Sequence, residues 1–152
     1  MKNYRKSIFM LVYSKVKDKI YYLILKRKLH WKGWEFPKGG IRKKEKILDA
    51  IKREIKEETG LKPLRTINLH YSGKYKYNKE LRDRPGILGQ EFKLYAVEVK
   101  KRKADISKNK DKEHSSYKWV GHKEALKKLT WPNQRQCLRI FNKFLKDNLL
   151  KK

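Results

Sequence analysis

The stretch from Gly39 to Leu61 restricts the fold more than any other part of the chain. It follows a proline and opens with two glycines, which together favour a tight turn. Apolar residues then recur every four positions, at Ile47, Ile51 and Ile55. That spacing is one face of a helix, and Gly60 is well placed to end it in the left-handed conformation. The sequence therefore predicts a turn followed by a helix over about residues 46–59.

Three acidic side chains share one face of the predicted helix. Glu54, Glu57 and Glu58 stand at positions i, i+3 and i+4. Because successive residues are rotated by about 100°, this face overlaps the apolar stripe, and we expect the carboxylates to be partly buried. Buried like charges repel one another unless a cation compensates them, and oxygen donors suit Mg²⁺ or Mn²⁺. The alternative is a solvated acidic turn neutralised by Lys52 and Lys56, and the spacing alone does not separate the two.

The complete pattern favours the metal site. After Gly39 and five further residues comes Glu45, and after seven more comes Arg53-Glu54-Ile55, followed by Glu57-Glu58 and Gly60-Leu61. This 23-residue arrangement resembles the signature, or box, of the Nudix (MutT-like) hydrolases at every defined position. The resemblance implies an α/β fold, the Nudix α/β/α sandwich, with the box helix and the C-terminal helix on different faces of a mixed β-sheet. We expect one such domain over residues 1–152.

The resemblance also implies a metal-dependent pyrophosphohydrolase. Divalent ions, Mg²⁺ or alternatively Mn²⁺, would bridge the phosphates of a nucleotide polyphosphate and lower the pKa of an attacking water. The implied metal ligands are Glu54, Glu57, Glu58 and the carbonyl of Gly39. Either Glu54 or Glu113 would act as the general base. Glu45 and Arg53 would form a structural ion pair, since the fork of an arginine suits a carboxylate.

Two further segments resemble asymmetrical diadenosine tetraphosphate hydrolases, the subgroup that the chain most resembles. Residues 34–39 are similar to their W-x-x-P-K-G segment, and residues 113–119 to their E-H-x-x-Y-x-W segment. The implied roles are phosphate binding by Lys38, an additional catalytic acid at Glu113 and base stacking by Tyr117. His114 and Lys118 are candidates for phosphate contacts.

Aromatic residues near these segments have less specific roles. His30 and Trp31 would line a base pocket, although Trp31 fits core or loop packing equally well. We expect Trp119 to pack in the core.

The middle of the chain supplies an alternative substrate. We expect residues 72–89 to form a long polar connection, either a nucleotide-binding loop or a solvated one. One segment partly matches RNA 5′-pyrophosphohydrolases, through Tyr77, Leu81-Arg82, Gly89-Gln90, Lys93 and Tyr95. This chain lacks the second Gln and the Trp of that family's pattern. Our first hypothesis is cleavage of diadenosine tetraphosphate to ATP and AMP. The alternatives are removal of pyrophosphate from 5′-triphosphate RNA, or a basic RNA-binding protein with a vestigial Nudix site.

Composition limits the partners and the cellular location. The net charge of +27 favours polyanionic partners such as nucleotides or RNA, although it also fits a lysine-rich genome or adaptation to heat. The single cysteine, Cys137, excludes an internal disulfide, and we expect a buried thiol in a cytoplasmic protein. No apolar run reaches the length of a membrane span. We favour a monomer, with an oligomer as the alternative.

Local patterns predict the remaining elements. Strands are expected over 7–13, 20–25, 64–71 and 90–99, the first two as a hairpin after a frayed basic lead-in over 1–6. Residues 100–112 form a charged linker, a short helix follows around 123–129, and another begins after the Trp131-Pro132 pair.

Overall fold

The computed structural model describes residues 3–29, 31–78, 82, 84–107 and 113–149. The elements in chain order are β1 (Tyr4–Val16), β2 (Lys19–Arg27), β3 (Gly33–Glu35), β4 (Lys38–Gly40), α1 (Ile47–Thr59), β5 (Arg65–Lys76), β6 (Gly89–Glu98), β7 (His114–Val120), α2 (His122–Lys128) and α3 (Pro132–Leu149). Two residues named above, His30 and Leu81, lie outside the described part of the chain.

The strands of the described residues form one mixed sheet. Its main order is β3-β2-β1-β6-β5, with β7 beside β2 and β4 beside β1. β1 runs parallel to β6, and the other pairs are antiparallel. On its other edge, β1 pairs with β4 near Phe9 and with β2 near Tyr13. The sheet therefore divides along β1. The prediction of a turn at the start of the box is wrong, because Lys38–Gly40 find a partner in Ser7–Phe9 of the central strand and form β4.

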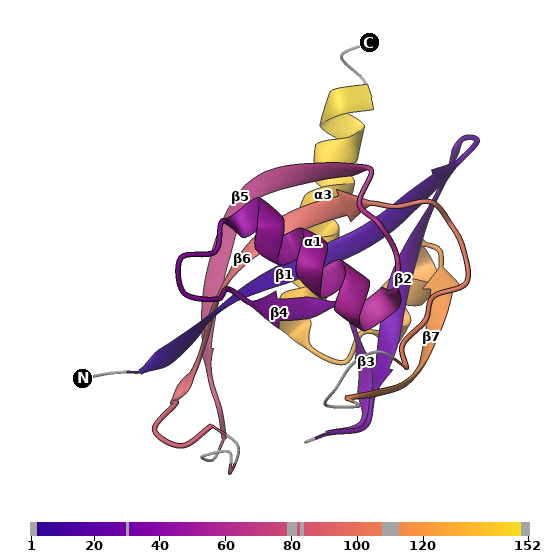
Figure 1. The fold of residues 1–152 in the computed structure, drawn as a ribbon. Coiled ribbons are helices and arrows are strands. Elements are labelled where there is room, and N and C mark those ends of the chain that lie inside the picture. Colours follow the sequence, from indigo (N-terminus) through magenta and orange to yellow (C-terminus); the bar gives the residue numbers. More distant parts are fainter. Residues whose placement is uncertain (1–2, 30, 79–81, 83, 108–112, 150–152) are drawn as a thin grey trace.

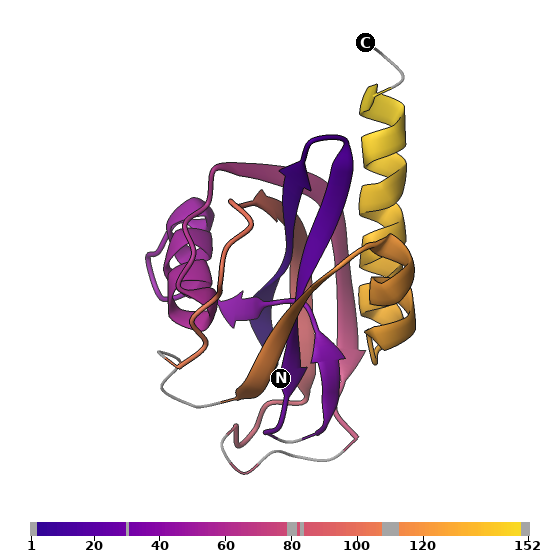
Figure 2. The same ribbon diagram turned by 90° about the vertical axis from the view of Figure 1, so that its right-hand side faces the viewer.

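Helices cover both faces of this sheet. Figure 2 shows α1 on one side and α2 with α3 on the other. Residues of β1 alternate between two buried clusters, because successive side chains of a strand point to opposite faces. Ile8, Met10 and Val12 pack with α1, whereas Phe9 and Leu11 pack with α3. The predicted α/β/α sandwich with a mixed sheet is confirmed (Figure 1).

The box helix forms where the sequence predicts it. Ala50, Ile51 and Ile55 are fully buried on its inner face. Gly60 has a φ of 70°, and its N–H donates to the Lys56 carbonyl, so it ends the helix in the left-handed conformation.

Two predicted boundaries are wrong. The supposed lead-in is not frayed, because Tyr4–Lys6 belong to β1 and pair with Gly89–Glu91 of β6. The connection expected over 72–89 is shorter, because β5 continues to Lys76 opposite the start of β6. Tyr71 and Tyr75 turn inward from this strand while lysines and serines face water. The polar half of that alternation is what led us to expect a loop.

No helix in the described part of the chain is long and apolar enough to cross a membrane.

Candidate active site

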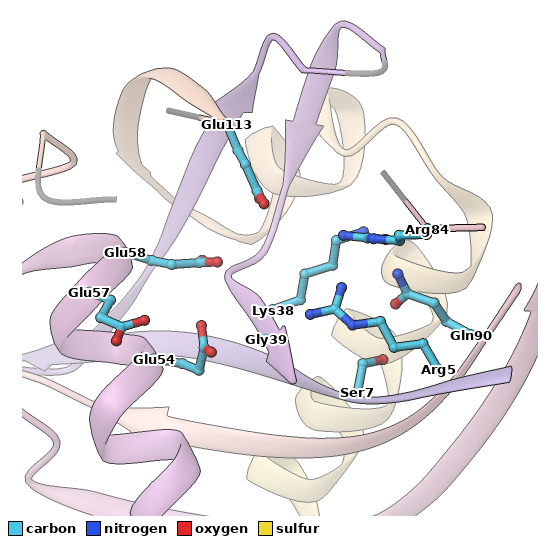
Figure 3. Close-up of a pocket in the computed structure, with 10 residues that line it drawn as sticks. All are labelled: Arg5, Ser7, Lys38, Gly39, Glu54, Glu57, Glu58, Arg84, Gln90 and Glu113. Carbon is cyan, nitrogen blue, oxygen red and sulfur yellow. The ribbon is translucent and has the colours of Figure 1, made fainter. Parts of the chain in front are cut away.

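A polar pocket lies where α1, β1 and β4 meet (Figure 3). Its cavity volume is about 100 Å³. It is lined by Arg5, Ser7, Lys38, Gly39, Glu54, Glu57, Glu58, Arg84, Gln90 and Glu113. The four glutamates stand on one side, and Arg5, Lys38 and Arg84 stand on the other. The two sets of opposite charge face a common space and define what the pocket can bind.

The acidic wall combines the last turns of α1 with the residue before β7. Glu58 is only 4% exposed, whereas Glu57 reaches solvent. Burial, reinforced by the carboxylates of Glu113 and Glu54, raises the pKa of Glu58 well above its ordinary value. Burial also raises the pKa of Glu54, against the opposing hydrogen bond from Arg53. These carboxylates are therefore destabilised as anions until a cation reaches them.

The acidic wall has the donors that a divalent cation requires. Oε2 of Glu58 is buried and has no hydrogen-bond partner among the described residues. An unpartnered buried carboxylate oxygen is costly, and Mg²⁺ or Mn²⁺ would satisfy it. The Gly39 backbone lies directly against the Glu54 side chain, since a Cβ at Gly39 would meet Glu54 Cδ at 2.3 Å. The residues present thus fit a divalent metal site.

Arg53 fixes the turn before α1 to the helix. Its Nε donates to Oε2 of Glu45 at 2.8 Å, and its Nη2 donates to Oε1 of Glu45 at 2.8 Å. The same Nη2 donates to the carbonyl of Gly40 at 2.9 Å. This fork with Arg53 lowers the pKa of Glu45 to about 2. The pair holds the backbone next to Gly39 in place, and Nη1 of Arg53 also contacts Glu54 and, at 3.5 Å, Glu57.

The basic wall comes from three separate segments. Arg5 belongs to β1, Lys38 to β4 and Arg84 to the connection between β5 and β6. Arg84 Nη1 donates to the Tyr77 hydroxyl at 2.9 Å, and Gln90 Nε2 donates to the same oxygen at 2.8 Å. Three cations opposite four carboxylates suit a ligand that carries both metal ions and phosphates.

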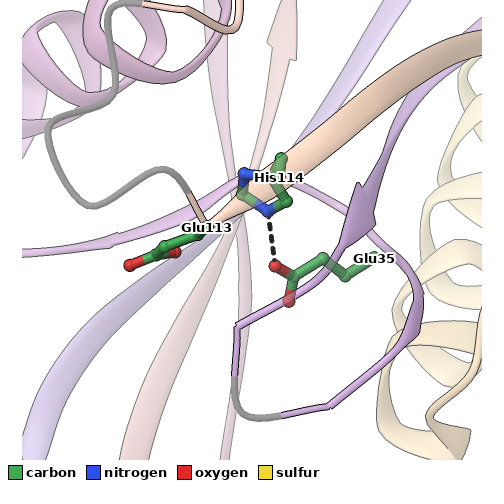
Figure 4. Close-up of side chains that lie close together, drawn as sticks. All are labelled: Glu35, Glu113 and His114. Carbon is green, nitrogen blue, oxygen red and sulfur yellow. Dashed lines mark hydrogen bonds and ion pairs between the residues drawn. The ribbon is translucent and has the colours of Figure 1, made fainter.

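A buried ion network lies behind the pocket (Figure 4). Glu35 Oε2 accepts from Arg27 Nη1 at 3.0 Å and from His114 Nε2 at 2.7 Å. Arg27 Nη1 also contacts Glu113 Oε2 at 3.2 Å. Burial would raise the pKa of Glu35, but Lys38, the hydrogen bond from His114 and Arg27 together lower it to about 2.

This network has a spacing that resembles a metal site. Glu35, Glu113 and His114 each offer a ligand atom within 4.8 Å of the others. Arg27 contacts both carboxylates and Lys38 contacts Glu35, so two cations already compensate the two acids without an ion. Among the box glutamates, Arg53 pairs with Glu54 and Glu57, but Oε2 of Glu58 has no hydrogen-bond partner among the described residues, which makes this group the better metal candidate.

The structure separates the residues predicted to bind substrate. Lys38 and Glu113 line the pocket, whereas His114, Tyr117 and Lys118 do not. His114 is buried against Glu35, and the half-buried Tyr117 packs with the cluster under α1. Lys118 lies on the opposite face of β7 and pairs with Glu124 at 2.7 Å. Trp119 also packs with the α1 cluster.

Sequence reasoning missed three charged residues that build the site. Arg5 was placed in the lead-in, although Arg5 and Ser7 share one side of β1 through strand alternation. Arg27 and Glu35 received no role. A lone acid between Trp34 and Phe36 was the available signal, because a charge in an aromatic run needs a buried partner.

An acidic wall, a cationic wall and a glycine-containing strand on an α/β/α sandwich define a class of hydrolases that act on phosphoanhydrides. Residues 3–141 match the family model of the NUDIX domain. The chain belongs to the Nudix family, which supports a pyrophosphohydrolase activity.

Relatives and solved structures agree with this membership. An RNA pyrophosphohydrolase of Francisella tularensis is 26% identical over 123 residues, covering 74% of this chain and 79% of the relative. The structure of a C. elegans Ap4A hydrolase binary complex superposes with a TM-score of 0.74 at 22% identity, covering 94% and 98% of the two chains. The E. coli dihydroneopterin triphosphate pyrophosphohydrolase gives a TM-score of 0.72 at 22% identity, covering 92% and 97%. The two structural similarities show the fold.

Proposed function

We propose that the protein removes pyrophosphate or phosphate from the 5′-triphosphate end of RNA in a reaction that depends on divalent metal, with Mg²⁺ or Mn²⁺ as the ion. The observation that carries the proposal is the pocket in which four glutamates face Arg5, Lys38 and Arg84. A 5′-triphosphate is the part of an RNA that needs both walls, because its charge must be offset by cations and by metal ions.

The cavity volume supports a substrate whose bases lie outside the pocket. A volume of about 100 Å³ is well below that of pockets which enclose drug-sized ligands, roughly 300 Å³ or more. The pocket therefore has room for phosphates and ions, and a nucleobase must find another surface.

An aromatic surface next to the pocket supports base binding there. The rings of Trp31 and Trp131 contact each other with centroids 5.2 Å apart, and Trp131 is 41% exposed. The Arg27 guanidinium lies 5.7 Å from the centre of the Trp31 ring and also contacts Glu113 of the pocket. Aromatic rings beside cations stack on the bases of single strands. We therefore propose that a base stacks on the tryptophan pair while its phosphates occupy the pocket.

The choice of RNA over a dinucleotide follows from which segments line the pocket. Arg84 and Gln90 come from the segment that resembles RNA pyrophosphohydrolases, and a relative that is 26% identical bears that name. From the two segments that resemble dinucleotide hydrolases, Lys38, Gly39 and Glu113 line the pocket, whereas the expected substrate contacts His114, Tyr117 and Lys118 do not. The net charge of +27 also favours a polyanionic chain.

The proposed chemistry assigns each wall one task. Divalent ions held by Glu54, Glu57 and Glu58 would offset phosphate charge and lower the pKa of the attacking water. Lys38, Arg5 and Arg84 bind the phosphate oxygens and orient the chain. Glu54 or Glu113 accepts the proton of the water as its oxygen bonds to phosphorus and the anhydride bond breaks. The products are a 5′-monophosphate RNA and pyrophosphate, or a 5′-diphosphate RNA and phosphate.

Product analysis on two substrates tests the proposal. We would compare a short 5′-triphosphate RNA with diadenosine tetraphosphate at equal concentration and Mg²⁺, using Glu57→Gln as the inactive control. The proposal expects faster turnover of the RNA, with a rate that falls steeply as salt rises. Faster release of ATP and AMP from the dinucleotide would refute it.

Cleavage of diadenosine tetraphosphate to ATP and AMP is the second candidate. Its support is the W-x-x-P-K-G segment, since its Lys38 faces the acids, together with Glu113. In that case Trp31 and Trp131 would stack on an adenine. Absence of metal-dependent turnover on both substrates would refute both candidates.

A further inference from the structure

Glu35 occupies an unusual position for a carboxylate. Its side chain is fully buried, although it sits only three residues before Lys38 on the pocket wall. An isolated buried charge is costly, so such a residue persists where its partners compensate it. These partners are Arg27, His114 and Lys38, whose Nζ lies 3.5 Å from Glu35 Oε1.

These contacts join the two walls of the pocket. Lys38 belongs to the basic wall, whereas Arg27 reaches the acidic wall through its 3.2 Å contact with Glu113. The strand pairing of β2 and β7 shifts register between Lys26 and Arg27, a bulge that re-aims side chains. One carboxylate thereby holds both cations at a point behind the cavity.

We propose that Glu35 is a positioning residue which holds Lys38 and Arg27 away from the metal-binding glutamates. Without its charge, Lys38 would turn toward Glu58, which lines the same pocket. Arg27 would pair more fully with Glu113. Either movement places a protein cation where a divalent ion should bind. The inference rests on the proposed use of Glu54, Glu57 and Glu58 as metal ligands and does not depend on which substrate is cleaved.

Direct binding of Mn²⁺ to Glu35→Gln tests this role. Isothermal titration calorimetry without substrate would measure the dissociation constant for Mn²⁺, and we expect it to rise about 10-fold, as is typical for residues behind a metal site. The matched control is Glu91→Gln. This variant removes an exposed carboxylate on β6 that pairs with Lys74 of β5. The control should bind Mn²⁺ as the unmodified protein does.

A double variant identifies the cation that interferes. If released Lys38 competes with the metal, Glu35→Gln combined with Lys38→Gln should bind Mn²⁺ more tightly than Glu35→Gln alone. A merely structural role would instead reduce the number of binding sites per molecule at an unchanged dissociation constant. Circular dichroism of each variant reports the folded fraction.

Two results would overturn the inference. They are an unchanged Mn²⁺ constant in folded Glu35→Gln and the same loss in Glu91→Gln. No recovery in the double variant would refute the part assigned to Lys38. If Glu35→Gln does not fold, Glu35→Asp retains the charge on a shorter side chain and should weaken Mn²⁺ binding in the same direction. An unchanged constant in Glu35→Asp would then refute the role. If the variants change Mn²⁺ binding as expected but the protein does not turn over RNA, the proposed substrate is refuted and this inference stands.

Discussion

Replacing Gly39 by alanine should damage the acidic wall with little effect on the fold. The three atoms nearest to the added Cβ all belong to the Glu54 side chain, at 2.3 to 2.5 Å. Glu54 would have to move by about 1 Å to restore ordinary contact, and a displacement of that size in a catalytic group costs roughly 100-fold in rate. The corresponding loss of transition-state stabilisation is about 2.7 kcal/mol.

The assay compares kcat/KM for the substrate that the wild-type protein turns over faster. Gly121→Ala is the matched control, because nothing lies within 4 Å of its added Cβ. We expect Gly39→Ala to lose about 100-fold and to weaken Mn²⁺ binding, with a melting temperature close to that of the control. Activity within threefold of the control would refute the idea that Gly39 makes room for Glu54. So would a loss fully explained by unfolded protein.

Three further predictions follow from the same geometry. Arg53→Lys loses the fork on Glu45 and should lower the midpoint of a urea titration, whereas an unchanged midpoint would contradict the structural role. Because the pKa of Glu58 is raised in the folded state, the metal-free protein should lose stability as pH rises from about 4.5 through that pKa. Melting temperatures of Glu58→Gln measured over the same pH range should lack this loss. The same pH dependence in the variant would mean that another group causes it. Trp131→Ala should raise KM for triphosphate RNA by about 10-fold at unchanged kcat, and an unaltered KM would exclude stacking on the tryptophan pair.

The box and the core could be predicted because their signals are local. Glu54, Glu57 and Glu58 lie on one face of α1 because of their spacing within the helix, and Gly60 ends that helix as expected. The apolar runs of β1 and β2 likewise specify strands, since both are short enough for a strand and are buried on both faces.

The boundaries of β1 and β5 could not be predicted, because pairing with β6 decides them. Tyr4–Lys6 and Ser72–Lys76 are polar enough to be loops, and each becomes a strand only where β6 supplies a partner. The same holds for Arg5, which reaches the pocket only because β1 extends that far.

Residue spacing alone identified the family and placed Glu54, Glu57 and Glu58 together, since all three lie on one face of α1. Folding was needed to form the cationic wall and the ion network that includes Glu35. Glu113 lies 86 residues from Arg27 in the chain, and no local period encodes a charge pair at that separation. The sheet that divides along β1 brings Lys38 and Arg5 opposite the glutamates.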